Sequence, residues 1–453
     1  MNTAEKIIPP AYALRAIELL EKEGFEAWFV GGCVRDAMLG RPPEDWDITT
    51  SALPRETAAC FQDFPCIDTG LKHGTVTAVL ENHPVEITTF RFDGVYTDHR
   101  RPETVEFSKK LEDDLSRRDF TINAMAYHPE RGLIDPFHGL FDLEKRILRC
   151  VGDPVRRFSE DALRILRCLR FSAVLELAID PATAAAVRSK KELLLAISHE
   201  RVREELHKLL LGNRAAPVLR EYAEVLFTVL PELASMKGCA QETPYHCYDV
   251  WEHTLHALAD VPKEPVLRWA ALFHDCGKPA VKFFSPDGTA HFYGHEKESL
   301  RIARQCLLRL RFSKRESEQI CTLITRHGEP LPISEKRLKR LLGELGEEQL
   351  FSLFALMHGD LAAQAPKLYE ERSRALEAAR ALTEKLLQEE ECLTLRDLAV
   401  NGSDLNALGI PPGPRMGEIL RALLEQVLDG ACPNEKDDLL RQAEGLYLSR
   451  HKE

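Results

Sequence analysis

Two aspartates one residue apart, Asp45 and Asp47, lead into the segment WDITTS, which is typical of a β-strand. Side chains at positions i and i+2 of a strand point to the same face of the sheet. Two carboxylates on one face repel each other unless a cation lies between them, and Mg²⁺ is a hard ion that prefers oxygen ligands. Glu86, in the strand-like run VEITTF, offers a third carboxylate. Three acids on neighbouring strands are typical of two-metal phosphoryl transfer; the alternative is a polar surface strand.

A pair of glycines precedes these acids. The run AWFV predicts a strand that continues into Gly31-Gly32 and then into a helix, VRDAML. Glycine lets the backbone approach a ligand closely, and the amides at a helix N-terminus favour anions. Arg35, on the first turn, adds a guanidinium toward a phosphate. A Gly-Gly turn is also common at ordinary strand–helix corners, so the carboxylates are what favour a phosphate site here.

A third pattern lies at 160–170, in EDALRILRCLR. Asp161, Arg164, Arg167 and Arg170 are spaced every three residues, which predicts one broad face of a helix. A carboxylate that accepts beside a guanidinium that donates complements the edge of cytosine or adenine, whereas UTP and GTP present the opposite polarity. The alternative is a solvated arginine stripe with an i,i+3 salt bridge.

Histidines and aspartates recur in the second half of the chain. They lie on several predicted helices, and one His-Asp pair ends an apolar helix in ALFHDCGKP. Imidazoles and carboxylates from several helices can build a site for a transition metal that activates water. The candidate ligands are His253, His274, Asp275 and Asp360.

The composition limits the class of protein. A chain of 453 residues suggests roughly three domains. It has no apolar run long enough for a membrane span and no signal-peptide pattern, and none of its twelve cysteines forms a CxxC pair, so a cytoplasmic protein with free thiols is expected. The net charge of −12 argues against a non-specific nucleic-acid binder, although eight basic and three acidic residues lie between Lys145 and Arg170.

The predicted fold class is α+β. Short strand-like runs (AWFV, VTAVL, VEITTF, TVEF) mix with helices in the first third of the chain, and helical patterns dominate after it, apart from a weak hairpin near 281–294. The predicted domains are a small α/β head at 1–145, an all-α neck at 146–235, a body at 236–365 and a helical tail at 366–453.

Five segments, in one order, resemble the signatures of the class II tRNA nucleotidyltransferases, the family of CCA-adding enzymes and bacterial poly(A) polymerases. The segments are VGGCVRDAMLGRPPEDWDITTSALP (30–54), DDLSRRDFTINAMAY (113–127), GLIDPFHGLFDLEKRILR (132–149), EDALRILRCLRFSA (160–173) and SHERVREELHKLLLG (198–212). The second half of the chain resembles the HD phosphohydrolase superfamily.

The resemblance assigns roles to these positions. It implies that Asp45, Asp47 and Glu86 are catalytic, with Mg²⁺ held by the two aspartates, and that the body binds a transition metal. Other residues would bind the nucleotide: Gly32, Arg35 and Arg118 the triphosphate, Asp119 and Asn123 the ribose, and Asp161 and Arg164, with Arg167 and Arg170, the base. In the body, His295 and His327 occupy the positions that a second metal would use in the HD superfamily.

The function that follows is addition of C, C and A to the 3′ end of tRNA from CTP and ATP, with a helical tail that binds tRNA. The segment 91–107, whose shortening in this family accompanies C-only addition, is long enough here to favour the complete activity. The alternatives are an A-adding enzyme or poly(A) polymerase with the same head, a metal-dependent phosphohydrolase acting at the HD site, and a pure RNA-binding module.

Overall fold

The computed structural model describes residues 7–67, 74–93, 105–243, 246–388 and 394–449. Positions 94–104 of the segment that favours complete CCA addition lie outside these ranges. The chain divides into two compact units, Met1–Ala234 and Ser235–Glu453. Within the part of the chain that is described, none of the helices combines the length and the apolar character that crossing a membrane requires.

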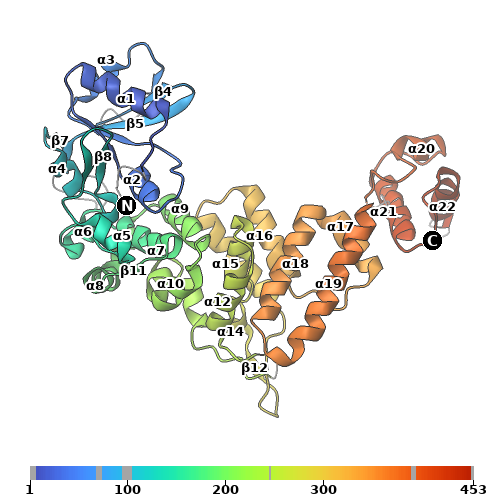
Figure 1. Ribbon diagram of the computed structural model, residues 1–453. Helices are drawn as coiled ribbons and strands as arrows, with labels where there is room; N and C mark the ends of the chain where they lie inside the picture. Colours follow the sequence, from blue (N-terminus) through green and yellow to red (C-terminus); the bar gives the residue numbers. More distant parts are fainter. Residues whose placement is uncertain (1–6, 68–73, 94–104, 244–245, 389–393, 450–453) are drawn as a thin grey trace. The chain divides into compact units, whose positions relative to one another are not determined.

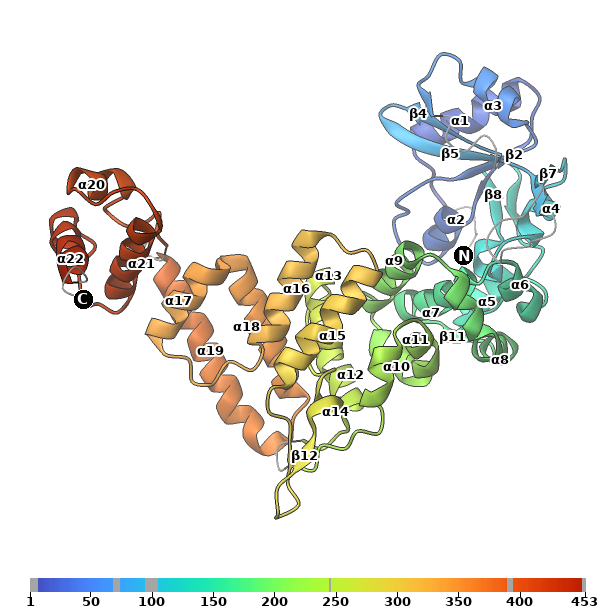
Figure 2. The same ribbon diagram turned by 180° about the vertical axis from the view of Figure 1, so that it is seen from behind.

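The first unit is built on a sheet with the strand order β3-β4-β5-β2-β1-β8-β9. Neighbouring strands are antiparallel except β2 and β5, which run parallel with Ile48 opposite Ile87. Figure 2 shows β4 and β5 of this sheet side by side. The strand-like runs are therefore strands, and AWFV is buried along its whole length as β1, between β2 and β8. The bounds are β1 Ala27–Val30, β2 Ile48–Thr50, β3 Cys66–Ile67, β4 Thr75–Leu80, β5 His83–Thr89, β8 Ala126–His128 and β9 Gly132–Ile134; β6 Arg91–Asp93 pairs separately with β7 Val105–Phe107.

Helices complete the first unit (Figure 1). The amphipathic helix α1 has four buried apolar residues and contacts β1, β4 and β5. Beyond the sheet, α7 packs against α9, and a two-stranded parallel pair, β10 Ile147–Leu148 and β11 Ala178–Ile179, precedes and follows α7. The helices are α1 Ala11–Lys22, α2 Gly32–Met38, α3 Pro54–Cys60, α4 Leu111–Ser116, α5 Gly139–Glu144, α6 Pro154–Glu160, α7 Leu163–Leu175, α8 Pro181–Lys190, α9 His199–Leu210, α10 Ala215–Glu221 and α11 Ala223–Val229, with 3₁₀ turns at Thr121–Asn123, Lys191–Ala196 and Pro231–Met236.

The second unit is helical. Its first helices pack around α13, which is apolar on almost all sides and buried from Leu267 to Phe273. The weak strand pattern forms a short antiparallel hairpin, β12 with β13. The elements are α12 Val250–Asp260, α13 Pro265–Phe273, α14 Lys278–Val281, β12 Phe283–Phe284, β13 Ala290–His291, α15 His295–Arg309, α16 Lys314–Arg326, α17 Glu335–Leu345, α18 Glu347–Ala362 and α19 Pro366–Gln388.

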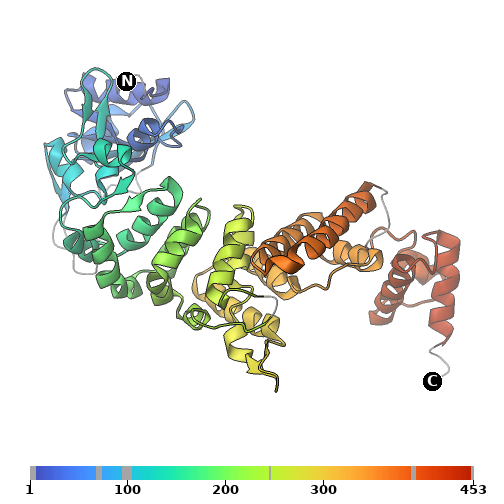
Figure 3. The same ribbon diagram turned by 60° about the horizontal axis from the view of Figure 1, so that its bottom comes forward.

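Three further helices, α20 Gly402–Ala407, α21 Pro414–Leu428 and α22 Lys436–Ser449, form the end of the chain and pack against one another (red in Figure 3). Their shared core includes Leu405, Leu423 and Leu439, which are fully buried. The predicted division into head, neck, body and tail stays a prediction, because compactness separates only two units.

Candidate functional site

The structure places the two aspartates immediately before β2 rather than inside it. The amide of Val30 in β1 still donates to the carbonyl oxygen of Asp47 at 3.0 Å, so the ladder extends one residue beyond the strand. Since Ile48 pairs with Ile87, Asp47 and Glu86 occupy the preceding positions on neighbouring strands. Asp45 and Glu86 are exposed, and Asp47 is half-buried.

The electrostatics of Asp47 fit a cation site. Burial raises the pKa of Asp47 to about 6, and the carboxylates of Glu86 and Asp45 add to the rise while Arg118 opposes it. Neighbouring carboxylates repel one another when all are ionised, and a divalent cation would neutralise that repulsion. Carboxylate oxygens are ligands that suit Mg²⁺. Among the described residues, two groups have three or more ligand atoms all within 4.8 Å of one another, and neither contains these acids.

Two guanidiniums lie beside the Gly31-Gly32 turn. Gly31 has a positive φ of 78°, which favours glycine, and a Cβ there would lie 2.9 Å from Nη1 of Arg118, so the guanidinium would have to shift away from the turn. Gly32 follows as the first residue of α2. Arg35 donates through Nη1 to Oδ1 of Asn123 at 2.7 Å, across 88 positions of sequence.

Asp114, which the sequence analysis did not select, holds Arg118 in place. Its Oδ2 lies 3.1 Å from Nη2 of Arg118 and accepts from the hydroxyl of Thr49 at 3.1 Å. Although burial raises the pKa of Asp114, Arg117 and Arg118 hold it below its usual value. The adjacent Asp-Asp and Arg-Arg pairs in DDLSRRD were the available signal.

Asp119 links the expected ribose pocket to the neck. Its Oδ1 accepts from Nδ2 of Asn123 at 2.9 Å, and its Oδ2 accepts from Nε of Arg167 at 2.8 Å. Burial opposes ionisation, but Arg167 and Asn123 hold the pKa of Asp119 well below its usual value. The N-cap of the following 3₁₀ turn is Phe120, so Asp119 is not the N-cap of that turn.

The prediction that Asp161 shares a helix face with the three arginines is wrong. The helix α6 ends at Glu160, Asp161 is extended with φ −135° and ψ 105°, and α7 begins at Leu163. The side chain of Asp161 accepts from the amide of Leu163 at 3.1 Å, and such a bond from an aspartate to the backbone two residues on interrupts helices. The three arginines do lie on α7.

The expected base-reading pair has other partners in this structure. Nη1 of Arg164 donates to Oε2 of Glu160 at 3.0 Å, and Nη2 donates to the carbonyl oxygen of Arg117 at 3.0 Å. Asp161 accepts from Nη2 of Arg201, on α9, at 3.4 Å. No direct bond between the two side chains is present among the described contacts.

Three arginine guanidiniums pack around one aromatic ring, that of Phe171. The guanidiniums of Arg35, Arg167 and Arg170 lie 5.1, 5.4 and 4.2 Å from the centre of the Phe171 ring. Arg170 also lies 3.2 Å from Glu205 on α9, and burial lowers the pKa of Arg170 to about 10. Phe171 thus joins Arg35, predicted to bind the triphosphate, with Arg167 and Arg170, predicted to bind the base, in one packed group.

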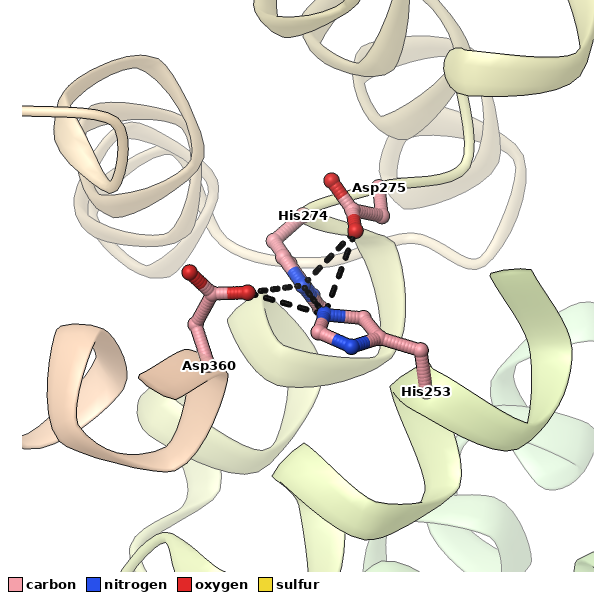
Figure 4. Close-up of side chains that lie close together, drawn as sticks. All are labelled: His253, His274, Asp275 and Asp360. Carbon is pink, nitrogen blue, oxygen red and sulfur yellow. Dashed lines mark hydrogen bonds and ion pairs between the residues drawn. The ribbon is translucent and has the colours of Figure 1, made fainter. Parts of the chain in front are cut away.

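The histidines and aspartates of the second unit converge (Figure 4). Nε2 of His253 lies 2.8 Å from Oδ1 of Asp360 and 3.4 Å from Oδ2 of Asp275, and Nε2 of His274 lies 3.3 Å from the same Asp275 oxygen. The four ligand atoms lie within 4.8 Å of one another. Burial opposes protonation, but Asp275 and Asp360 raise the pKa of His274 to about 10, so the acids attract positive charge to this cluster.

A second group shares Asp275. Its Oδ1 lies 3.3 Å from Nε2 of His295 and 3.7 Å from Nε2 of His327, and this set also meets the 4.8 Å criterion. Each of the four imidazoles places Nδ1 within 3.2 Å of a backbone carbonyl oxygen. Because a carbonyl oxygen only accepts, Nδ1 carries a proton, and Nε2 is the nitrogen that would bind a metal after losing any proton of its own.

Two glycines bring these ligands together. A Cβ on Gly359 would lie 2.6 Å from Cγ1 of Val261 and 3.0 Å from the carbonyl oxygen of Ala257, so its absence lets α18, which carries Asp360, pack onto α12. A Cβ on Gly277 would lie 2.6 Å from the carbonyl oxygen of His295, so α15 can approach the His274-Asp275 turn.

Comparison with known proteins matches three family models to this chain. The family model for the poly A polymerase head domain matches residues 27–149, one for an RNA- and SrmB-binding site of polymerase A matches 176–237, and one for domain 2 of tRNA nucleotidyltransferases matches 297–443. The CCA-adding enzyme of Lacticaseibacillus paracasei is 35% identical over 433 residues, which cover 94% of each chain. This chain belongs to the CCA-adding enzyme family.

Other CCA-adding enzymes support this assignment. The enzyme of Geobacillus thermodenitrificans is 46% identical over 268 residues, covering 57% of this chain and 66% of the relative. A crystal structure of the Bacillus stearothermophilus CCA-adding enzyme in complex with CTP matches this chain with a TM-score of 0.73 and 32% sequence identity. The match covers 98% of this chain and 100% of the Bacillus chain. The predicted family, the α+β fold and the enzyme class are therefore confirmed: the chain is a nucleotidyltransferase that adds CCA to tRNA.

Proposed function

We propose that the first unit carries the CCA-adding activity through the carboxylates before β2 and the arginines that face them. The observation that carries the assignment is the position of Asp47 within the electrostatic reach of Glu86, Asp45 and Arg118. That arrangement combines oxygens that bind a cation with a guanidinium that binds a phosphate, which is what transfer of a nucleotide requires.

The reaction joins the RNA to the α-phosphate of CTP or ATP. The 3′-hydroxyl oxygen of the RNA forms a bond to the α-phosphorus, the bond from that phosphorus to the bridging oxygen breaks, and pyrophosphate leaves with the electron pair while the hydroxyl proton passes to solvent. Mg²⁺, when held by Asp45 and Asp47, supplies charge neutralisation at the reacting oxygens. Arg35 and Arg118, fixed by Asn123 and Asp114, orient the triphosphate.

Base selection falls to Asp161 and Arg164. We assign Asp161 to accept from the exocyclic amine of cytosine or adenine and Arg164 to donate to the ring acceptor. Because Arg201 and Glu160 bond these side chains in the structure, the incoming base must replace those two contacts. The edge of the base is neutral, so neutral hydrogen bonds replace the two charged contacts. Arg164 can keep its bond to the carbonyl oxygen of Arg117 during this exchange.

A second function is favoured by the shared carboxylate of the second unit. We propose that His253, His274, Asp275 and Asp360 hold one transition-metal ion and that Asp275, His295 and His327 hold another, as in an HD-type phosphohydrolase. A metal pair held by such ligands supplies activated water for cleavage of a phosphoester bond. This activity would be independent of the first unit's chemistry.

The decisive experiment supplies radiolabelled CTP alone, or CTP with ATP, to tRNA that lacks its last three nucleotides. Addition of two C residues with CTP alone, and of C, C and A with both, is expected. Absence of CMP incorporation would reject complete CCA addition in favour of an A-adding enzyme or poly(A) polymerase. Arg164→Ala is expected to lose discrimination against UTP and GTP, whereas Arg156→Ala, an exposed arginine on α6, should leave it unchanged.

We also place the enzyme in the cytoplasm. No disulfide joins any two of the eleven described cysteines, as is usual in a reducing compartment. Its partners are tRNA, CTP and ATP.

A further inference from the structure

Aromatic rings line one side of the β12–β13 hairpin in the second unit. Phe283 lies opposite His291 in the ladder, with ring centres 5.3 Å apart and planes 28° apart, and His291 stacks on Tyr293 at 5.3 Å and 24°. Yet Phe283 is 46% exposed and Tyr293 is 74% exposed. We call Phe283, His291 and Tyr293 the aromatic ladder; large rings held in parallel but left open to solvent are not explained by packing within the chain.

Lysines accompany this ladder. Nζ of Lys282 lies 4.8 Å from the ring centre of Phe284, which is 55% exposed, and also pairs with Glu242 at 2.6 Å. Nζ of Lys278 lies 5.6 Å from the ring centre of Phe292. Exposed rings beside a lysine are a combination that binds nucleotides, because rings stack with bases and an accessible ammonium attracts phosphates. Of these two lysines, Lys278 is buried, so Lys282 is the one that could meet a phosphate.

The ladder leads directly into the metal-ligand cluster. Tyr293 is two residues before His295, so their Cα atoms lie at most about 7.6 Å apart. Nδ1 of His295 donates to the carbonyl oxygen of Phe292 at 3.0 Å. Lys278, whose ammonium faces the Phe292 ring, lies 2.6 Å from Oδ2 of Asp275, the carboxylate that both ligand groups share.

We propose that the aromatic ladder stacks the terminal base of a single-stranded RNA, so that the adjoining phosphate is presented to the cluster around Asp275. The first half of this inference is a binding site for a base. The second half, that the bound RNA end is the substrate of the cluster around Asp275, rests on the proposed phosphohydrolase function. Stacking accepts any base, so the site selects RNA ends without reading their sequence.

The test is photo-crosslinking of the full-length protein to a five-nucleotide RNA with 4-thiouridine at its 3′ end, followed by mass mapping of the crosslinked peptides. Crosslinks are expected within 281–294, and the Phe283→Leu/Tyr293→Leu double variant should lose them at least tenfold. Both side chains are exposed, so this variant is expected to fold. Phe351→Leu, which removes a half-buried ring elsewhere in the same unit, should crosslink like the unmodified protein.

Two outcomes would overturn the proposal. One is the absence of hairpin crosslinks, or their persistence in the double variant. The other is a change in sedimentation of the double variant with no effect on crosslinking, which would make a second copy of the chain the occupant. CCA addition should be unchanged in both variants.

A parallel assay separates this inference from the hydrolase function. With Mn²⁺ present, the double variant is expected to raise the KM for a 2′,3′-cyclic nucleotide about tenfold with little change in kcat, because only the stacking of the base is lost. A protein that crosslinks through the ladder but hydrolyses no phosphoester would reject the hydrolase function and leave base binding supported. Hydrolysis without crosslinking would reject the ladder alone.

Discussion

The carboxylate of Asp119 lies 2.6 Å from Nη2 of Arg167, so the expected ribose pocket of the head is held directly by the helix that carries the base-selecting arginines. Asp119 is 7% exposed. Since the same carboxylate also binds Asn123, which in turn binds Arg35, one chain of bonds runs from the base side to the phosphate side. The residues that we propose for the nucleotide's three parts are therefore linked to one another by direct bonds.

Asp119→Asn is expected to lower the free energy of unfolding by about 3 kcal/mol, because it leaves the guanidinium of Arg167 without its buried counter-charge. This loss of stability can be measured from the unfolding transition of the first unit in a chemical denaturation experiment. Glu18→Gln, which removes an exposed partner of Arg15, should change it by less than about 0.5 kcal/mol. Equal losses in the two variants would contradict a structural role for the Asp119–Arg167 pair.

Asp45→Asn and Asp47→Asn should each reduce CCA addition by at least about a thousandfold, since each removes a carboxylate assigned to Mg²⁺. Binding of tRNA, measured by filter retention, should stay within about twofold. Asp63→Asn, at another exposed aspartate of the head, provides the matched control and should retain full activity. Activity that survives in Asp45→Asn or Asp47→Asn would reject the metal assignment.

The raised pKa of Asp47 predicts a pH-dependent response to Mg²⁺. In the folded protein this pKa is about 6 against an ordinary value of 3.8, so protonation of Asp47 favours the fold at low pH and that contribution is lost as pH rises through about 6. Mg²⁺ needs the ionised form, and should therefore raise the melting temperature more at pH 7.5 than at pH 5.

Thermal melting of Asp47→Asn, measured at both pH values with and without Mg²⁺, provides the control for this pH effect. The variant should melt at a higher temperature than the unmodified protein when Mg²⁺ is absent at pH 7.5, and should lose most of the Mg²⁺-dependent rise. An unaltered response to Mg²⁺ would place the ion elsewhere.

The cluster in the second unit should hold metal without contributing to CCA addition. His274→Ala is expected to lower the bound Mn²⁺ per chain, measured by elemental analysis after dialysis, from about two to below one, because it removes a buried ligand beside the shared Asp275. His358→Ala, an exposed histidine on α18 that pairs with Asp260 instead, should retain the metal. Loss of CCA addition in His274→Ala, with the fold intact by circular dichroism, would contradict independent functions.

Gly359→Ala should loosen the same cluster through packing. The added methyl group would press on Val261 and on the carbonyl oxygen of Ala257, at a cost of about 1–3 kcal/mol in the free energy of unfolding, and the displaced α18 should weaken Mn²⁺ affinity. Gly445→Ala, in α22 with no neighbour within 4 Å of the new Cβ, should instead be neutral or stabilise by up to about 1 kcal/mol. Similar effects of both substitutions would show that the close approach at Gly359 does not matter.

Much of the site could be predicted because its signals are local. The strand AWFV, the Gly31-Gly32 turn and the acids before WDITTS are contiguous, and their types state their chemistry without reference to the rest of the chain. The histidine–aspartate pattern was also readable from the sequence, since the His274-Asp275 pair directly follows the apolar segment that forms α13. Family resemblance then ordered these segments into one enzyme.

Asp161 shows where this reasoning failed. The three-residue spacing predicted one continuous helix, but the carboxylate bonds the amide of Leu163 and the chain changes direction there. An aspartate on the surface of a helix and an aspartate that interrupts a helix can have the same spacing from the next charged residues. A periodic pattern therefore cannot tell the two apart.

By itself, the sequence determined the family, the order of the segments and the kinds of ligand that each segment contributes. Only the tertiary structure decided which side chains bind one another. It selected Asp114 as the anchor of Arg118, gathered three guanidiniums on Phe171, and made Asp275 the carboxylate common to two ligand groups. The physical reason is that such contacts join residues from separate elements, and their distances are set by how those elements pack, down to the missing Cβ atoms of Gly31 and Gly359.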